Sequence, residues 1–368
     1  VSLRPTPKLF STSNKRVVRA LARGGMVLGG LTAAGAVAGA AALAWGVSEG
    51  RRQRSFDLAG KTALVTGGSR GLGFAIAREL LRRGCRVTIC ARDSDALRRA
   101  AGQLEQEAPA GAGIFAYPCD LSKPSAATEL VAAVQAHWGS VQVLIHNAGI
   151  MQIGPWDAMT EDDFQKAMEV HFWAALRLAQ AVLPHMIQRR QGRIVNISSI
   201  GGLVAVPHML PYTCSKFALV GLSQGLASEV RRHGVRVCCV CPFLTRTGSQ
   251  EQVTVKGRHD REFAWFAAAG SLPGLTQSAD HVARVVARVC ERGTAHTTLS
   301  LPGKAAALAH GLAPSATVAL MAQADRLLPS GHAPDGHEPR HGRDSYNPWT
   351  RRVVQPFIHQ EGSRLNQV

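Results

Sequence analysis

Short runs of β-branched residues alternate with longer amphipathic runs from residue 57 to residue 303, and this alternation constrains the fold more than any other feature. Lys61–Thr66 is typical of a strand and Gly71–Arg83 of a helix, and the same order repeats along the chain. Strict alternation of this kind produces parallel strands joined by right-handed helical crossovers. We therefore expect an α/β fold, a Rossmann-like doubly wound parallel sheet of about seven strands with helices on both faces.

The remaining elements follow from the same periodicity. Later strands are expected at 86–90, 113–117, 141–146, 193–197, 235–240 and 297–301, and later helices at 93–107, 124–138, 161–189, 212–232 and 279–291. Residues 57–303 thus form the predicted catalytic domain. An apolar extension at 304–328 is expected to fold as a pair of short helices, and 329–368, rich in Pro, Gly and His, as a flexible polar tail.

Positive charge is concentrated at the N-terminus, around an uncharged stretch. The whole chain carries a formal net charge of +17, and residues 1–56 hold nine basic side chains against one acidic. Residues 24–48 contain no charged side chain. As a helix they would span about 37 Å, enough to cross a hydrocarbon core of about 30 Å. This arrangement favours a membrane over a nucleic acid as the partner of the basic residues.

Two other interpretations of residues 24–48 stay open. The segment could be a signal peptide cleaved after Ala42-Leu43-Ala44, or an Ala- and Gly-rich helix lying on a surface. All eight cysteines lie between Cys85 and Cys290, several in apolar runs, which is typical of free thiols in a reducing compartment. We therefore expect a membrane-associated protein whose catalytic domain faces the cytoplasm.

The cysteine spacing does not predict a metal site. Cys238 and Cys241 give the only C-x-x-C spacing, but they fall within a predicted strand, where their side chains would point apart. His332, His337 and His341 lie in the predicted tail, with no cysteine nearby. No metal is expected.

A glycine-rich turn joins the first predicted strand to the first helix. Its sequence is Thr66-Gly67-Gly68-Ser69-Arg70-Gly71-Leu72-Gly73. Glycines let the backbone approach a pyrophosphate, which then lies at the helix N-terminus, where N–H groups have no intrahelical partner. The turn therefore predicts a dinucleotide site.

The residues after the second strand select the dinucleotide. A carboxylate there would bind the ribose 2′-OH of NAD, whereas an arginine accommodates the 2′-phosphate of NADP. Here Arg92 holds that place and Arg70 is a second candidate, while Asp93 is expected to cap the next helix. NADP(H) is the preferred cofactor and NAD(H) stays possible.

Ser199, Tyr212 and Lys216 are the candidate catalytic residues. Tyr212 and Lys216 are four residues apart, so they share one face of a helix. An ammonium near a phenol favours phenolate and lowers the phenol pKa from about 10, which suits a general acid/base. Ser199, at the end of the fifth strand, could donate to a substrate oxygen.

These segments together resemble the short-chain dehydrogenase/reductase family over about two-thirds of the chain. The family's T-G-x-x-x-G-x-G turn, N-A-G segment, serine and Y-x-x-x-K motif all occur in order and at the family's separations. The resemblance implies that Tyr212 exchanges the proton, that Lys216 tunes it and holds the nicotinamide ribose, and that Ser199 orients the substrate oxygen. It also implies a homo-oligomer.

The resemblance extends to the cofactor. Asp120 would contact the adenine, Asn147 would lie along the cofactor and Thr247 would contact the carboxamide. The full set of candidate cofactor-binding residues is Thr66, Gly67, Ser69, Arg70, Gly71, Leu72, Gly73, Arg92, Asp120, Leu121, Asn147, Ala148, Gly149, Tyr212, Lys216, Pro242 and Thr247.

Two positions depart from the family pattern. His171 stands where the family commonly has an asparagine that supports a proton relay, so we expect a relay with a pH dependence in the histidine range. The alternative is that His171 is only a tolerated packing residue. Phe243 replaces the glycine that usually follows Pro242, so we expect a different loop on the nicotinamide side.

The expected function is hydride transfer between NADP(H) and a carbonyl/alcohol pair. Phe263, Trp265, Phe266, Leu272 and Leu275 lie in the predicted substrate lid, 243–278, and favour an apolar substrate. The alternative is a catalytically weak nucleotide-binding sensor or scaffold at a membrane, for which His171 and Phe243 are the motivation. The uncharged stretch within the basic N-terminus disfavours nucleic-acid binding.

Overall fold

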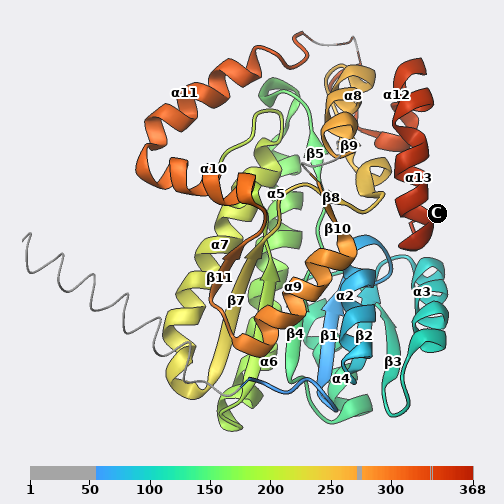
Figure 1. Cartoon of the computed structure of the whole chain (residues 1–368), viewed down its shortest axis with the longest axis vertical. Coiled ribbons are helices and arrows are strands. Elements are labelled where there is room, and N and C mark those ends of the chain that lie inside the picture. The colour runs from blue at the N-terminus through green and yellow to red at the C-terminus, as the bar shows by residue number, and fades with distance from the viewer. Residues whose placement is uncertain (1–54, 272–275, 332, 334, 368) are drawn as a thin grey trace, which may run out of the picture. The chain divides into compact units, whose positions relative to one another are not determined.

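A computed structural model describes residues 55–271, 276–331, 333 and 335–367 of the chain. Seven parallel strands, most of them buried on both faces, form its central sheet in the order β11-β7-β6-β4-β1-β2-β3 (Figure 1). The strands are β1 (Thr62–Thr66), β2 (Arg86–Ala91), β3 (Gly113–Pro118), β4 (Val143–His146), β6 (Gly192–Ile197), β7 (Val235–Cys241) and β11 (His296–Thr298). The predicted doubly wound sheet is confirmed.

Helices cover both faces of this sheet, because each crossover between parallel strands carries one. The helices are α2 (Gly71–Arg82), α3 (Ser94–Glu107), α4 (Ala126–Trp138), α5 (Glu161–Met168), α6 (Ala174–Gln188), α7 (Leu210–Val230) and α9 (Ala279–Arg292). Buried side chains of α2, α3 and α9 form one core with the sheet, and those of α4 and α6 form a second core on the opposite face.

The strand order reverses at β1, and this reversal positions the site. From β1 the chain runs outward through β2 and β3, then returns to the other side of β1 at β4 and continues to β11. Loops at the carboxyl ends of β1 and β4 therefore diverge and leave a crevice, where ligands of such sheets bind.

One predicted helix and one predicted strand are corrected. The helix expected over 161–189 is interrupted by a π-helical turn, Glu169–Trp173, between α5 and α6. The strand expected over 297–301 ends at Thr298, because Ser300 caps a new helix by accepting from the Gly303 N–H.

The predicted substrate lid folds mostly into short elements. It contains β8 (Thr245–Arg246), β9 (Thr254–Val255), α8 (His259–Ala269) and β10 (Gln277–Ser278). β9 pairs with β5 (Gln152–Ile153) and β12 (Arg340–His341) in a small separate sheet. Leu272 and Leu275 lie outside the described residues.

The C-terminal region is more ordered than its composition indicates. The expected helical pair is present as α10 (Leu301–Leu312) and α11 (Pro314–Asp325). The expectation of a flexible tail is wrong for residues 335–367, which contain β12, α12 (Pro348–Val353) and α13 (Gln355–Arg364). Val354 and Ile358 are buried against Phe263, and Leu365 joins the main core.

The candidate membrane segment, 24–48, lies outside the described residues. In the part of the chain that the structure covers, no helix combines the length and the apolar character needed to cross a membrane.

Candidate active site

The turn between β1 and α2 has a geometry that requires glycine. Gly67 and Gly71 have φ angles of +64° and +58°, a region that other residues seldom adopt. A Cβ added to Gly73 would lie 2.0 Å from the carbonyl oxygen of Gly67. The turn is thus compact, and it leads directly into the N-terminus of α2, the kind of position where a pyrophosphate binds.

Hydrogen bonds fix this turn to the end of β4. Thr66 Oγ1 accepts from the backbone N–H groups of Asn147 and Ala148, each at 3.0 Å. Asn147 Nδ2 donates to the Thr66 carbonyl at 3.1 Å. Asn147, predicted to lie along the cofactor, therefore also holds the turn in shape.

Arg70 and Arg92 lie close together where the 2′-phosphate was predicted. Burial lowers the pKa of Arg70, and the nearby charge of Arg92 lowers it further. Asp93 caps α3 as expected, since its carboxylate accepts from the N–H groups of Asp95 and Ala96 at 3.0 Å each. Two guanidinium groups thus share one region, and a bound dianion would relieve their repulsion.

The other predicted cofactor residues surround the crevice. Asp120 Oδ1 accepts from Ser122 Oγ at 2.8 Å, and Leu121 beside it is buried. Thr247 Oγ1 donates to Ser249 Oγ at 2.7 Å. The Pro242 carbonyl accepts from the Ile200 N–H at 2.9 Å, which joins the loop after β7 to the loop after β6.

Ser199, Tyr212 and Lys216 come together at the carboxyl end of β6. Lys216 Nζ donates to the Ile197 carbonyl at 2.9 Å and lies 5.6 Å from the centre of the Tyr212 ring. Tyr212 and Lys216 are both buried, and Ser199 makes a hydrogen bond with the Tyr212 hydroxyl.

The expected lowering of the tyrosine pKa is not seen in the protein alone. Burial raises the pKa of Tyr212 to about 12, and the hydrogen bond with Ser199 offsets only part of this effect. Burial also lowers the pKa of Lys216 to about 8. Desolvation outweighs the attraction between ammonium and phenolate here, so Tyr212 stays protonated, the form that can donate a proton to a carbonyl oxygen.

His171 is fully buried in the π-helical turn, and its ring packs edge-on against Tyr212 with 5.5 Å between centroids. The Ile150 N–H donates to Nε2 at 3.2 Å, so Nε2 carries no proton in the neutral ring. Nδ1 then carries the proton and donates to Ser215 Oγ at 2.8 Å. Both ring nitrogens are engaged by protein groups, which favours a structural role.

The expected pH dependence of a His171 relay is contradicted by its environment. Burial holds the pKa of His171 well below its usual value, and the nearby charges of Lys216 and His146 lower it further. The ring therefore stays neutral across the range in which histidine normally titrates.

We expect His171→Asn to leave the shape of the kcat/KM–pH profile between about pH 5 and pH 8 unchanged. An inflection near pH 6.5 that disappears in the variant would contradict this assignment. The pH dependence of folding stability should change instead. The unfolded chain protonates His171 at its usual pKa and the folded chain does not, so stability is full above about pH 6.5 and falls as the pH drops. As the pH drops below about 6.5, the Tm of the His171→Asn variant should therefore fall less than that of the wild type.

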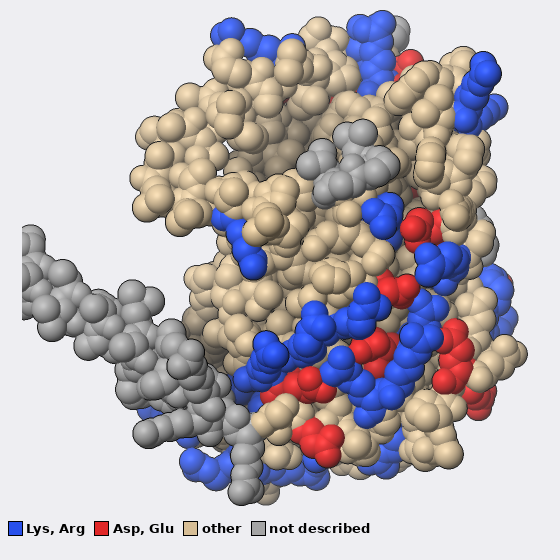
Figure 2. Space-filling view, viewed as in Figure 1, with Lys and Arg blue, Asp and Glu red and all other residues tan. Residues whose placement is uncertain are grey.

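A cavity of about 540 Å³ lies between the 204–210 segment and the C-terminal helices. One wall is the 204–210 loop, which connects the strand end bearing Ser199 to the helix bearing Tyr212, and the other is α11. Most lining side chains are apolar, among them Val204, Val206, Leu210, Val318, Met321 and Ala322. Figure 2 shows a hollow beside the α10–α11 arm that few charged side chains border. Neither Ser199 nor Tyr212 lines the cavity itself.

The C-terminal residues contact the glycine turn, which the sequence did not predict. The Leu365 carbonyl accepts from the Gly71 N–H at 2.8 Å. Asn366 Nδ2 donates to the carbonyls of Ser69, at 2.6 Å, and Ala96, at 3.0 Å. No local pattern could reveal contacts between residues separated by almost 300 positions.

Comparisons with known proteins identify the family. The family model for short chain dehydrogenases matches residues 61–257. Gluconate 5-dehydrogenase of Gluconobacter oxydans is 34% identical over 209 residues, which are 56% of this chain and 78% of that protein. Fatty acyl-CoA reductase of Acinetobacter baylyi is 35% identical over 193 residues, 52% of this chain and 64% of that protein.

A solved structure of a short-chain oxidoreductase also matches the chain. A metagenomic short-chain oxidoreductase in complex with NADP matches with a TM-score of 0.54 and 31% identity, covering 66% of this chain and 97% of that one. Fold and site define an NAD(P)-dependent oxidoreductase. The protein belongs to the short-chain dehydrogenase family.

Proposed function

We propose that the protein is an NADPH-dependent reductase of apolar carbonyl compounds, with Tyr212 as the proton donor. The observation that carries this proposal is the buried, protonated Tyr212 beside Ser199 and Lys216, in a fold whose glycine turn contains Arg70 with Arg92 nearby. The reverse reaction, alcohol oxidation, uses the same groups.

The residues present fit a phosphorylated dinucleotide. A Cβ at Gly67 would lie 2.9 Å from the Ala148 Cα, and one at Gly73 would meet the turn itself, so only glycine fits the compact turn that a dinucleotide site uses. The Gly71 N–H at this turn already donates to the Leu365 carbonyl, so a pyrophosphate bound there would replace that contact. Arg70 and Arg92 supply positive charge beside it. The solved relative in complex with NADP supports the preference for NADP over NAD.

The cofactor, when bound, supplies the hydride. Ser199 would donate a hydrogen bond to the substrate oxygen, and Tyr212 would pass its proton to that oxygen as it gains charge. Lys216, held by the Ile197 carbonyl, would keep a positive charge near the phenol and stabilise the phenolate that forms. Burial of these groups excludes water from the transfer.

The cavity supports an apolar substrate. Its aliphatic lining suits long-chain or ring-containing aldehydes and ketones better than sugars. In a panel of aliphatic aldehydes, steroids, retinoids, ketoacyl compounds and sugars with NADPH, we expect kcat/KM to rise with the apolar area of the substrate. Faster turnover of sugars would contradict the substrate class, while NADPH binding without turnover of any carbonyl would favour the sensor or scaffold.

Replacing Arg92 should change cofactor selectivity. We expect Arg92→Ala to raise KM for NADPH about tenfold, because a charge-assisted hydrogen bond to the 2′-phosphate is lost. KM for NADH, which has no such phosphate, should not change. Arg189→Ala, at the exposed end of α6, is the matched control. An equal rise in both KM values would show that Arg92 acts on the fold and not on the phosphate.

We also propose membrane association, with the catalytic domain facing the cytoplasm. The uncharged segment 24–48 supports it, and so do the large aliphatic side chains that α10 and α11 expose, including Leu308, Leu312 and Leu320. Full-length protein that resists both high salt and alkaline washing would support a spanning segment. Release by alkali alone would indicate surface binding, and release by salt alone would contradict an apolar anchor.

We further propose that the protein is a homo-oligomer, as the family resemblance implies. Light scattering of detergent-solubilised protein tests this proposal.

A further inference from the structure

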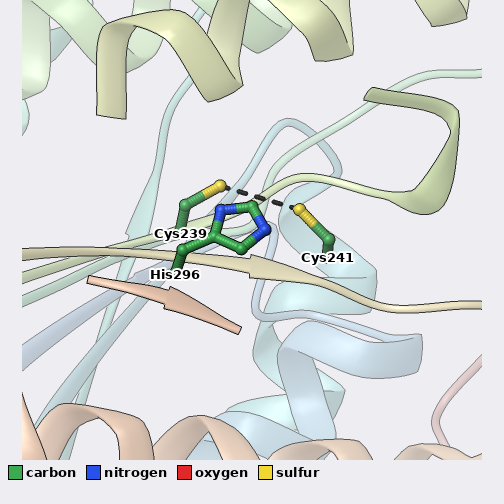
Figure 3. A group of neighbouring side chains, drawn as sticks. All are labelled: Cys239, Cys241 and His296. Atoms are coloured by element: carbon green, nitrogen blue, oxygen red, sulfur yellow. Dashed lines mark hydrogen bonds between the residues drawn. The ribbon is translucent and has the colours of Figure 1, made fainter. Parts of the chain in front are cut away.

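Two cysteines and a histidine converge at the edge of the central sheet. Cys239 and Cys241 are two residues apart on β7, so their side chains leave the same face of the strand. β11 pairs with β7 so that His296 stands opposite Cys239. Figure 3 shows the His296 imidazole lying between the two thiols. One ligand atom from each residue lies within 4.8 Å of the others.

The spacing of the sulfur atoms matches a tetrahedral metal site. The two Sγ atoms are 3.8 Å apart. Two sulfurs bound to one tetrahedral Zn²⁺ at about 2.3 Å each are separated by about 3.8 Å. The thiols therefore need no large movement to share an ion.

The histidine has the hydrogen bonding of a metal ligand. Its Nε2 bonds Thr298 Oγ1 at 3.2 Å, while its Nδ1 is buried and makes no hydrogen bond to the described residues. Metal-binding histidines usually use one nitrogen for the ion and the other for an oxygen that orients the ring. Thr298 fills the second role and leaves Nδ1 for the ion.

We propose that Cys239, Cys241 and His296 bind Zn²⁺. Each thiol releases its proton to solvent on binding, so two thiolates neutralise the ion and the neutral imidazole completes three ligands, with water in the fourth position. Both cysteines are fully buried, and His296 lies half-buried on β11, the edge strand, where an ion can enter. The only C-x-x-C spacing pairs Cys238 with Cys241, so the sequence pattern alone does not predict this set.

The position of the site links it to catalysis. An ion there would join β11 to β7 directly below α7, since Val220 of that helix packs on Cys239 and Cys241. The chain leaves Cys241 into the loop that carries Pro242 and Thr247. Zn²⁺ would thus stabilise the strand end from which the nicotinamide-side loop begins.

Cobalt binding to the reduced, chelator-treated, full-length protein tests the proposal. We expect one Co²⁺ per chain, a sulfur-to-cobalt charge-transfer band, displacement of that band by Zn²⁺, and a rise in Tm with either metal. Cys239→Ser and Cys241→Ser should weaken Co²⁺ binding by at least about tenfold. Cys238→Ser is the matched control, because the Cys238 thiol lies on the opposite face of β7, near the Val289 carbonyl, and its Co²⁺ affinity should not change.

His296→Ala provides a second route if a cysteine variant does not fold, as judged by circular dichroism. Its side chain is less buried than the cysteines, and loss of the band with an unchanged spectrum of secondary structure would support the site. A wild-type protein without a charge-transfer band would overturn the proposal. So would variants of Cys239, Cys241 and His296 that bind Co²⁺ as tightly as Cys238→Ser.

A second inference, which rests on the proposed use of NADPH, concerns Asn366. Its amide bridges the carbonyls of Ser69, in the glycine turn, and Ala96, in the first turn of α3. Arg70 follows Ser69 in the glycine turn, and Arg92 lies just before α3. Asn366 is 4% exposed and has a φ of +54°, a conformation that asparagine tolerates better than most residues.

The geometry points to Asn366 as a positioning residue that sets the separation of the glycine turn and the start of α3. We expect Asn366→Ala to raise the Kd of NADPH about fivefold, to lower NADPH-over-NADH selectivity and to leave kcat unchanged. Asn366→Gly keeps the backbone conformation but lacks the amide, so it should behave like the alanine variant.

Fluorescence titration of NADPH distinguishes the outcomes. Wild-type affinity in both variants, or in Asn366→Gly alone, would overturn the positioning role. Tighter NADPH binding in the variants would also overturn it, because the C-terminal residues would then obstruct the cofactor. A wild-type protein that binds no NADPH would contradict the proposed function itself.

Discussion

Tyr212→Phe is expected to lower kcat/KM for carbonyl reduction by about 10²- to 10⁴-fold, the usual contribution of a positioned general acid. The substitution removes one hydroxyl from a buried ring that packs against His171. The phenylalanine ring can keep that packing, so NADPH affinity and Tm should change little. Steady-state kinetics together with NADPH titration separate the chemical step from binding.

Tyr346→Phe is the matched control for this result. The Tyr346 hydroxyl donates to Glu251 at 2.8 Å, in the C-terminal region and outside the catalytic group. Its loss should cost about 1 kcal/mol of stability and leave kcat/KM unchanged. A Tyr212→Phe enzyme within tenfold of wild type would mean that another group supplies the proton.

Gly73→Ala should have the second largest effect, a loss of NADPH affinity of at least about 100-fold, or about 2.7 kcal/mol. The new methyl would lie 2.0 Å from the Gly67 carbonyl oxygen and 2.5 Å from Asn147 Nδ2. The nearer of these atoms belongs to the backbone, so the turn itself must move to admit the methyl. That movement displaces the surface on which the pyrophosphate rests.

Gly102→Ala is the matched control, because a Cβ there meets nothing within 4 Å. It lies within α3 and should raise stability by up to about 1 kcal/mol while NADPH binding stays constant. If Gly73→Ala bound NADPH like wild type, the glycine turn would not be the dinucleotide site. Circular dichroism shows whether any loss reflects global unfolding.

The fold was predictable because its signals are local. Strand periodicity, the turn from Thr66 to Gly73 and the spacing of Tyr212 from Lys216 each depend on neighbouring residues, and the structure brings them to one crevice. Asp93 likewise caps α3 as its position indicated.

The errors arose where distant contacts decide the structure. The C-terminal segment is polar in composition, yet Ile358 and Leu365 find partners in cores built by residues 56 to 299. The π-helical turn carries His171, whose Nε2 accepts from the N–H of Ile150, a residue 21 positions earlier in the chain. The Cys239, Cys241 and His296 group forms only when β11 pairs with β7.

The pKa of Tyr212 shows a further limit. Spacing along a helix indicates which groups are neighbours, but not how much water surrounds them. Burial raises the pKa of the phenol and lowers that of Lys216, and neither effect can be read from a motif.

The most direct test of the central claim is deuteride transfer from NADPH labelled at the nicotinamide C4 to an apolar aldehyde or ketone. The account predicts that purified protein forms the alcohol with one deuterium at the former carbonyl carbon for each NADPH consumed, and that Tyr212→Phe forms it at least about 100-fold more slowly. Bound NADPH with no labelled alcohol from any carbonyl in the panel would contradict the account.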